Sequence, residues 1–437
     1  MGLLKFDLNR NDGKFKMLNA TNGGPWHKRH AKENSRSNFE DYKNARIPYS
    51  RNHDSNACGI YGGPFAHDIS AIFPNFDADE NDPNSYDFAC TDESILVSLE
   101  TNTKTFFRLG QTIEGQIKKH HTLPPKDYHK WARICEHIIR HYTEGWADGF
   151  THDMPYWEIW NEPDIDPDDR VVKRAWGGTK AQFFDFYEVA AKHLKSCFPH
   201  LKIGGPALAC RVYWGEEFLC EMQKRNVPID FFSWHIYYTD PKVVIEQAET
   251  IKGLLIKYGY KDAESIIDEW NYIGDWGEGF VQSIVDIGGV KGMAYTMSVI
   301  CGAQSTDALD MLMYYDTRPG AFCGPFDFYT AKPRKPYYAL YWYGMFYDME
   351  KYVKCDTQIE DVYTLCGVDK DGKSLTIVCY YNNEDLKNKT VKLDFGKKGA
   401  QYEIYAVDKD NNGELIKTTC DLTFDMPINS MLLIKEI

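Results

Sequence analysis

Several patterns that would identify a metal, redox or disulfide protein are missing from this sequence. Its 12 cysteines are scattered, with no Cys-x-x-Cys pair and no histidine cluster at the spacing of metal ligands. The acidic stretch 77–83 looks at first like a calcium loop, but Asp82 stands where an EF-hand needs glycine and Phe88 where it needs the bidentate acid. The sequence therefore predicts no metal, no cofactor and reduced thiols.

The features of nucleic-acid and membrane proteins are missing as well. The 64 acidic residues outnumber the 50 Lys and Arg residues, and the formal net charge of −14 argues against nucleic acid or an anionic membrane as a partner. No apolar run approaches transmembrane length. The N-terminal Met-Gly-Leu-Leu-Lys-Phe-Asp-Leu has no apolar core long enough for a signal peptide. With reduced cysteines, the expected location is the cytoplasm, and the oligomeric state stays open.

What is present indicates a folded protein rich in aromatic side chains. Hydrophobic residues make up 43% and charged residues 26% of the 437 positions, and aromatics reach 15%, with 29 Tyr and 11 Trp. Aromatic faces pack against the apolar faces of pyranose rings, but a large core also consumes aromatic residues. The length suits one large domain plus a small one.

Short apolar segments alternate with helical patterns through most of the chain. The strand candidates are 16–22, 45–50, 105–109, 156–160, 201–204, 229–233, 265–267 and 311–315, and the helix candidates include 92–102, 131–142, 180–197, 242–258 and 280–301. Almost every strand candidate ends in polar or aromatic residues. This order predicts an α/β fold, a parallel (β/α)₈ TIM barrel with its site at the carboxyl ends of the strands. An open doubly wound sheet is the alternative, which the lack of a glycine-rich phosphate loop after the first strand disfavours.

A different pattern begins near residue 350. Short strand candidates separated by turns follow one another at 362–366, 375–381, 390–395, 402–407 and 431–434. They predict a small β-sandwich, to which an alternating N-terminal strand at 3–8 is expected to add. The predicted domains are therefore a barrel over residues 15–345 and a sandwich made of residues 1–14 with 346–437.

Two glutamates stand out by their place in the predicted barrel. Glu162 follows the fourth strand and Glu269 the seventh, each beside Trp and Asn. Each alone is equally well explained as a carboxylate at the end of a strand. Together they face each other across one barrel mouth, and paired carboxylates carry out glycoside hydrolysis, where one protonates the leaving oxygen and the other attacks the anomeric carbon or activates water.

These residues resemble glycoside hydrolase family 39, a clan A family that includes β-xylosidases and α-L-iduronidases. Trp-Asn-Glu-Pro at 160–163 is similar to the acid/base motif of the clan, and Asp-Glu-Trp-Asn at 268–271 to its nucleophile motif. The likeness runs from Asn19 to about Trp342. It includes Asn-Gly-Gly-Pro at 22–25, Arg-Asn-His at 51–53, Ser-Trp-His-Ile-Tyr at 233–237, Gly-Pro-Phe at 324–326 and Lys-Pro at 335–336.

The resemblance implies a retaining double displacement with two catalytic glutamates. Glu162 would give a proton to the leaving group and later take one from water, while Glu269 would form the glycosyl-enzyme ester. Burial is expected to raise the pKa of Glu162, and hydrogen-bond donors are expected to keep Glu269 ionised. The candidate donors are Arg51, His235 and Tyr237.

The resemblance also implies a set of substrate-binding residues. Asn161 is expected to bond the sugar 2-hydroxyl, and Trp270 and Tyr315 to form stacking walls. Two histidines, His53 and His235, either contact substrate or are hydrogen-bonded within the protein behind it. Trp176 either lines the pocket or anchors its own loop.

The sequence departs from the family pattern near the expected sugar pocket. Tyr314-Tyr315-Asp316 stands where a tryptophan is expected, and Gly324-Pro325 interrupts a Gly-Gly pair, so the identity of the sugar is left open. The predicted function is a retaining glycoside hydrolase with a carbohydrate substrate, exo-acting on β-xylosides or related glycosides. The alternatives are a catalytically inactive carbohydrate-binding protein on the same barrel and an endo-glycanase of the same clan.

Overall fold

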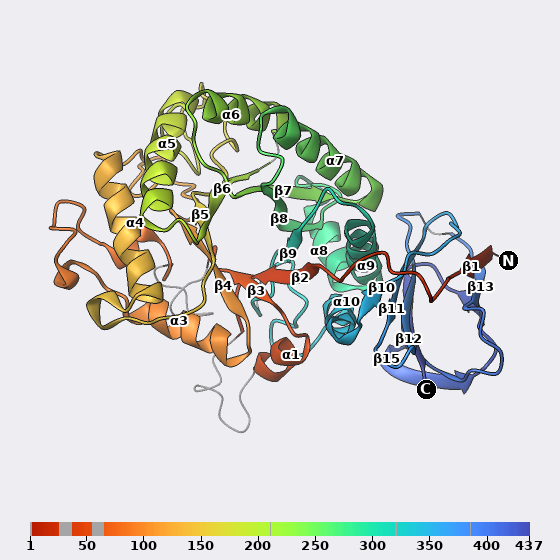
Figure 1. Ribbon diagram of the computed structural model, residues 1–437. Coiled ribbons are helices and arrows are strands. Elements are labelled where there is room, and N and C mark those ends of the chain that lie inside the picture. The colour runs from red at the N-terminus through yellow and green to blue at the C-terminus, as the bar shows by residue number, and fades with distance from the viewer. Residues whose placement is uncertain (1, 26–36, 55–64, 210, 320, 385) are drawn as a thin grey trace.

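The structure, a computed structural model, describes residues 2–25, 37–54, 65–209, 211–319, 321–384 and 386–437. Within these ranges the chain forms a barrel of strands surrounded by helices, and a smaller all-β unit on one side of it (Figure 1). Both ends of the chain lie in the smaller unit.

Eight parallel strands close the barrel in chain order. They are β2 (Met17–Asn22), β3 (Tyr49–Arg51), β4 (Lys104–Leu109), β5 (Tyr156–Ile159), β6 (Lys202–Leu208), β7 (Phe231–Tyr238), β8 (Glu264–Tyr272) and β9 (Met311–Tyr314). Nearly every residue of these strands is buried, as expected for strands with packed side chains on both faces. The predicted (β/α)₈ barrel is confirmed.

Helices cover the outside of the barrel (Figure 1). They are α1 (Phe39–Asn44), α2 (Ile69–Ile72), α3 (Ala89–Glu100), α4 (Tyr128–Thr143), α5 (Lys180–Cys197), α6 (Val212–Lys224), α7 (Pro241–Lys257), α8 (Phe280–Gly288), α9 (Val290–Ser305) and α10 (Lys335–Gly344). The start of α5 is set by a capping box, in which Thr179 accepts the backbone N–H of Gln182 and the Gln182 side chain accepts that of Thr179.

The barrel interior is filled at the amino ends of the strands. Its apolar plug consists of Ala20, Tyr49, Phe106, Tyr156, Phe231, Ile266, Met311 and Met313. The polar residues of the interior lie further along the strands, so the packed lower layers support a polar layer at the carboxyl ends.

Some element boundaries differ from the sequence prediction for local backbone reasons. Strand β3 begins only at Tyr49, because Pro48 has no N–H for the sheet and Arg46 has a left-handed φ of 53°. The predicted helix 280–301 is two helices, α8 and α9, with a bend of 76° between them. Gly289 takes the extended angles φ −103° and ψ −165° at the break, which the apolar pattern running across it does not reveal.

The smaller unit consists of two sheets. One is β1 (Gly2–Lys5), β13 (Lys389–Asp394) and β16 (Thr423–Met426), and the other is β10 (Lys351–Tyr352), β11 (Val362–Val368), β12 (Ser374–Tyr380), β17 (Ser430–Glu436), β14 (Tyr402–Val407) and β15 (Asn412–Thr419). The expected sandwich is confirmed, and β1 pairs with β13. Strand β15 was missed, because it is an exposed edge strand without buried alternation.

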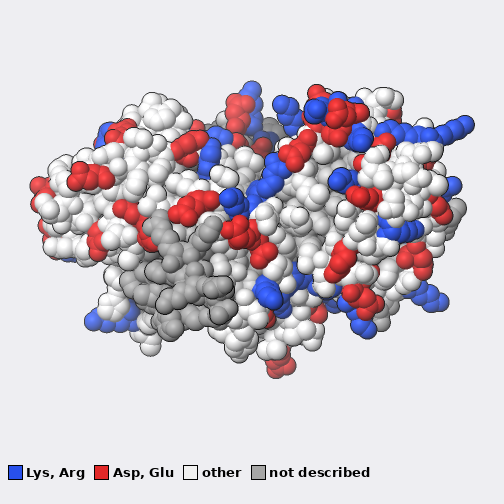
Figure 2. Space-filling view, turned by 90° about the horizontal axis from the view of Figure 1, so that it is seen from below, with Lys and Arg blue, Asp and Glu red and all other residues white. Residues whose placement is uncertain are grey.

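Helix α9 lies between the barrel and the sandwich (Figure 1). Its backbone carbonyl at Ala294 accepts a bond of 3.4 Å from the Cys379 thiol on β12. No single helix among the described residues is long and apolar enough to cross a membrane, and only the bent pair α8 and α9 passes by length and composition. On the molecular face in Figure 2, acidic and basic side chains are interspersed.

Candidate active site

The turn after β5 orients the first of the two glutamates. Trp160 and Glu162 have φ of 75° and 49°, left-handed values that cost a residue with a side chain roughly 1 kcal/mol each. The backbone N–H of Glu162 donates to the carbonyl of Ala207 at 2.9 Å, which ties the turn to β6. The two left-handed residues lie on either side of Asn161. The side chains of Asn161 and Glu162 therefore do not continue the alternation of strand β5.

Glu269 lies within β8 and receives a donor on each carboxylate oxygen. Arg51, the last residue of β3, donates from Nη1 to Oε1 at 2.8 Å, and Tyr237 of β7 donates its hydroxyl to Oε2 at 2.9 Å. Only 5% of Glu269 is exposed. These two residues were among the predicted donors, and the barrel brings both to the carboxylate.

The two glutamates face each other across the mouth, with His235 of β7 between them. An oxygen of each carboxylate and a ring nitrogen of the histidine all lie within 4.8 Å of one another. The Nδ1 atom of His235 is 3.0 Å from Oε1 of Glu162 and 3.5 Å from Oε2 of Glu269. The histidine therefore contacts both carboxylates, which favours direct participation in the site over a position behind it.

The charges of the site change its proton affinities. Burial alone would lower the pKa of His235, but the carboxylates of Glu269 and Asp268 hold it well above the ordinary value, so the ring is a cation. Burial raises the pKa of Glu269 to about 7, against the lowering effect of His235 and Arg51. This differs from the sequence expectation, because the desolvation of a carboxylate this deeply buried outweighs its donors.

Two further predicted residues present unpaired polar atoms in the same layer. The oxygen of Asn161 accepts from Nη2 of Arg51 at 2.7 Å, and its Nδ2 has no partner among the described residues. His53 lies 3.9 Å from Oε1 of Glu269, and its Nδ1 is likewise unpaired there. Burial and the charge of Arg51 keep the pKa of His53 well below its ordinary value, so this ring is neutral. Buried polar groups are normally hydrogen-bonded, so both atoms are free to bond water or a group that enters the mouth.

Aromatic side chains form one side of the mouth. Tyr315 follows β9 and donates its hydroxyl to Asp54 at 2.8 Å, and its ring lies 6.4 Å from that of Tyr237. Trp276, in the loop after β8, meets Tyr237 edge-on at 5.2 Å and is 57% exposed. Phe322 joins the group, 6.4 Å from both Tyr315 and Trp276. Trp276 was missed, although an aromatic residue in a glycine-rich loop beside the second glutamate is a usable signal.

Two predicted wall residues lie elsewhere. Trp270 is fully buried and packs on Tyr295 of α9 and on Tyr314, because alternation along β8 turns it to the outer face of the sheet. Trp176 is 3% exposed, packs on Trp160 and donates to the carbonyl of Thr179 at 2.9 Å. The structure corrects the prediction for Trp270, which is a core residue, and favours the second of the two interpretations of Trp176, an anchor of its loop.

Two carboxyl groups beneath the site were also missed. Glu158 of β5 and Asp268 of β8 are completely buried, and their oxygens lie 2.7 and 3.1 Å from Nε of Arg51. Nε2 of His235 lies 3.4 Å from Asp268. A charged residue within a strand that is otherwise buried was the available signal for Glu158, since such groups are rarely buried without a partner.

One further cluster brings possible metal ligands together, on the outer helices. Glu136 of α4 with His193 and Cys197 of α5 have ligand atoms within 4.8 Å of one another. The carboxylate of Glu136 already contacts His193 at 2.7 Å and pairs with Arg140 at 2.9 Å, so contacts within the protein account for this cluster.

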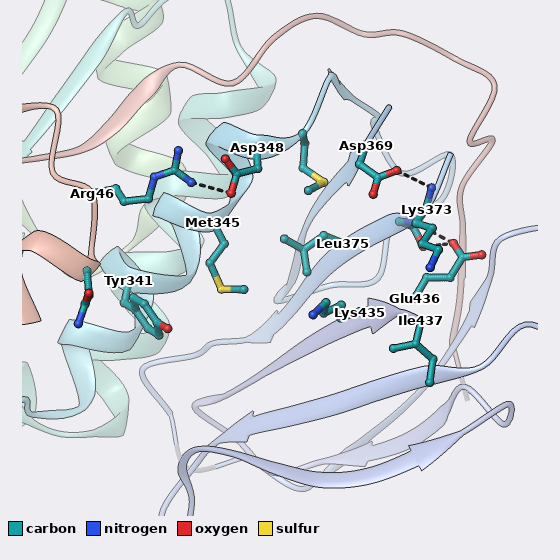
Figure 3. Close-up of a pocket in the computed structure, with 13 residues that line it drawn as sticks. Arg46, Tyr341, Met345, Asp348, Asp369, Lys373, Leu375, Lys435, Glu436 and Ile437 are labelled. Carbon is teal, nitrogen blue, oxygen red and sulfur yellow. Dashed lines mark hydrogen bonds and ion pairs between the residues drawn. The ribbon is translucent and has the colours of Figure 1, made fainter. Parts of the chain in front are cut away.

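A cavity of about 750 Å³ lies outside the barrel mouth, between barrel and sandwich (Figure 3). None of the predicted site residues lines it. Several of its charged groups are already paired, as in the 2.8 Å ion pair of Arg46 and Asp348 and the 2.7 Å ion pair of Glu436 with Lys397. We regard it as a crevice between the two units.

With this geometry in hand, comparison with known proteins decides the family. The sequence profile of glycosyl hydrolases family 39 matches residues 26–254, more than half of the chain. The chain belongs to glycosyl hydrolases family 39. The resemblance inferred from the motifs is thereby confirmed, and the expected enzyme class, an O-glycosyl hydrolase, is that of the family.

The individual relatives are distant. The chain is 31% identical over 181 residues to a β-xylosidase of Caldicellulosiruptor saccharolyticus, which covers 40% of this chain and 35% of that protein. It is 26% identical over 241 residues to a β-xylosidase of Geobacillus stearothermophilus, and this match covers 48% of this chain and 46% of that protein. The matched regions thus span less than half of either relative. A glucosidase structure from Croceicoccus marinus covers 100% of this chain and 99% of its own, with a TM-score of 0.81 at 20% identity, and shares the fold.

Proposed function

We propose that the protein is a retaining, exo-acting glycoside hydrolase that releases a β-linked xylose or a related sugar by double displacement. Glu162 is the acid/base and Glu269 the nucleophile. Family membership supports a carbohydrate substrate, and two relatives named as β-xylosidases support the choice of sugar.

The observation that carries this proposal is the closeness of the two carboxylates. Oxygens of Glu162 and Glu269 lie within 4.8 Å. Retaining enzymes hold their carboxyl groups about 5–5.5 Å apart, whereas inverting enzymes leave about 6.5–9.5 Å for a water molecule. The spacing therefore supports direct attack by Glu269 on the anomeric carbon.

The first step forms the bond between an oxygen of Glu269 and the anomeric carbon. The bond to the leaving oxygen breaks, and that oxygen takes the proton of Glu162. As Glu162 becomes negative, the adjacent His235 cation at 3.0 Å stabilises it. In the second step the Glu162 carboxylate removes a proton from water, whose oxygen attacks the anomeric carbon and releases Glu269 as a carboxylate.

The binding of the sugar uses the unpaired groups of the mouth. The free Nδ2 of Asn161 is a donor for the 2-hydroxyl, a bond that strengthens in the oxocarbenium-like transition state. The neutral ring of His53 can bond another hydroxyl. Tyr315 and the exposed face of Trp276 offer stacking surfaces for a sugar ring.

The proposal is tested by release of nitrophenol from a panel of aryl glycosides. The panel contains β-xyloside, α-arabinoside, β-glucoside, β-galactoside and α-iduronide, and the proteins are the native enzyme, Glu162→Ala and Glu269→Ala. Activity on the β-xyloside that is lost in Glu269→Ala, with a β-glycosyl azide formed when azide is added to Glu162→Ala, is the expected result. Unchanged activity in either variant, or silence of the native enzyme on every glycoside, contradicts the proposal.

A further inference from the structure

Below the catalytic pair, Glu158 and Asp268 lie on the same edge of the Arg51 guanidinium. Both side chains are completely buried, and both approach Nε of Arg51, at 2.7 and 3.1 Å. That atom carries one hydrogen, which it donates to Glu158. Arg51 directs its other donors upward to the site, with Nη1 to Glu269 and Nη2 to Asn161.

One oxygen of each carboxyl group, Oε1 of Glu158 and Oδ1 of Asp268, accepts no hydrogen bond from the described residues. Among the same residues, the other oxygen of Asp268, Oδ2, has only two cationic groups near it, Nε of Arg51 at 3.1 Å and Nε2 of His235 at 3.4 Å. Because an oxygen of each group approaches the same Nε atom, the two carboxyl groups lie close together. Two ionised carboxylates in contact would repel and leave buried acceptors unpaired, whereas one proton between them converts the contact into a hydrogen bond.

The charges of the site lead to the same conclusion. Four carboxyl groups, Glu158, Glu162, Asp268 and Glu269, surround two cations, Arg51 and His235. The proposed reaction starts with Glu162 protonated and Glu269 ionised. The buried cluster is then neutral only if Glu158 and Asp268 together carry one negative charge.

We propose that Glu158 and Asp268 share one proton and act as a positioning pair that holds Arg51 and His235 against the catalytic glutamates. The single negative charge of the pair balances one of the two positive charges of Arg51 and His235, and ionised Glu269 balances the other. The pair's role in catalysis and the charge count rest on the proposed function, but the burial of both carboxyl groups beside one Arg51 nitrogen does not.

The proton affinities agree with this arrangement. Burial and the neighbouring Asp268 raise the pKa of Glu158 to about 8, although Arg51 opposes the shift. Burial alone would raise the pKa of Asp268 too, but Arg51 and His235 hold it below its ordinary value. The other groups facing the pair are the Ser233 hydroxyl, the Tyr187 hydroxyl of α5 and the carboxyl group of Glu269. Glu158 is thus the proton carrier.

The shared proton can be observed without any substrate. Infrared spectroscopy of the native protein at neutral pH should show, beside the bands of Glu162 and Glu269, a separate carbonyl stretch of a protonated carboxyl group that titrates near pH 8. Glu158→Gln should remove this band, because the amide takes over the donor role. Asp268→Asn should remove it as well, because Glu158 then ionises to balance Arg51. Glu264→Gln is the matched control, a β8 carboxylate that binds Lys202 at the opposite end of the strand, and should leave the band unchanged.

The positioning role is tested by the pH dependence of kcat/KM on the glycoside found active in the panel. Loss of the shared proton should contribute an alkaline limb near pH 8 in the native enzyme, and Glu158→Gln should move that limb upward by about one pH unit or more. A purely structural residue would lower activity without moving the limb. A band that persists in both single variants, or a pH profile of Glu158→Gln identical to that of the native enzyme, would overturn the proposal. A protein silent on the whole panel contradicts the proposed function alone, since the infrared band is still measured.

Discussion

The hydroxyl of Tyr237 donates a 2.9 Å hydrogen bond to Oε2 of Glu269, and the ring of the same tyrosine meets Trp276 edge-on at 5.2 Å. One side chain therefore connects the nucleophile to the aromatic side of the mouth. A change at Tyr237 should affect the chemistry at Glu269, whereas a change at Trp276 should affect the binding of sugar.

Replacement of Tyr237 by phenylalanine removes a donor to a carboxylate and leaves the ring in place. A hydrogen bond to a charged group contributes about 1.5–3 kcal/mol, so kcat/KM at neutral pH should fall about tenfold to a hundredfold. The donor favours the ionised form, so its loss should also raise the pKa of Glu269 and move the acid limb of the pH profile upward.

Tyr238→Phe is the matched control for this variant. The next residue of β7 carries the same hydroxyl on a side chain that is 46% exposed, so its loss should leave the profile unchanged. An acid limb that stays in place in Tyr237→Phe would contradict the assignment of Tyr237 as a donor to ionised Glu269.

Trp276→Ala should weaken the binding of substrate more than it slows the reaction. An aromatic contact of this kind contributes about 1 kcal/mol beyond the area it buries, so KM for the preferred glycoside should rise about fivefold to tenfold. Steady-state kinetics of Trp276→Phe should show a smaller rise in KM than Trp276→Ala. Thermal stability should hardly change, because the indole is 57% exposed.

Trp176→Ala provides the contrast. This indole packs in the core against Trp160 and Phe186, so its removal should lower the free energy of unfolding by about 3–5 kcal/mol. Denaturant titration of Trp176→Ala and Trp276→Ala measures the two losses of stability. A rise in KM with native stability in Trp176→Ala would instead support the original prediction of a pocket residue.

Arg51→Met should destabilise the fold as well as abolish activity. It leaves Glu158, Asp268 and Glu269 buried without their guanidinium, and removal of one partner from a buried ion cluster costs about 3–5 kcal/mol. Urea titration measures the loss. Arg46→Met is the control, because its pair with Asp348 is solvent-exposed and should be worth less than about 1 kcal/mol.

The raised pKa of Glu269 predicts a loss of stability with increasing pH. Its ordinary value is 4.5 and its value in the fold is about 7, so between these limits the native state binds more protons than the unfolded chain. The free energy of unfolding therefore falls as pH rises through this window. Glu269→Gln removes the effect and should be more stable than the native protein by about 3 kcal/mol at pH 8, with no gain at pH 4.

Urea titrations at the two pH values check this prediction, with Glu264→Gln as the control carboxylate. Equal gains at both pH values would mean that packing, not ionisation, separates Glu269→Gln from the native protein.

Much of the site's framework followed from local sequence patterns. Apolar strands ending in polar residues, each followed by a helical period, were enough to predict the barrel and the strand ends that carry Glu162 and Glu269. Strand alternation and helix periodicity depend on neighbouring residues, so both patterns can be recognised in the sequence. The break between α8 and α9 could not be predicted in this way, because the apolar pattern continues across the two glycines at which the helix ends.

The tertiary structure decided which side chains enter the mouth. Trp270 adjoins Glu269 in sequence but lies on the outer face of the sheet, while Trp276 in the following loop reaches Tyr237. Glu158 and Asp268 are 110 residues apart in sequence on different strands, and only barrel closure brings both to Arg51. The sequence by itself determined the fold and the two glutamates, because these depend on local order. Which residues surround them depended on the geometry of a closed barrel, in which distant strand ends share one layer.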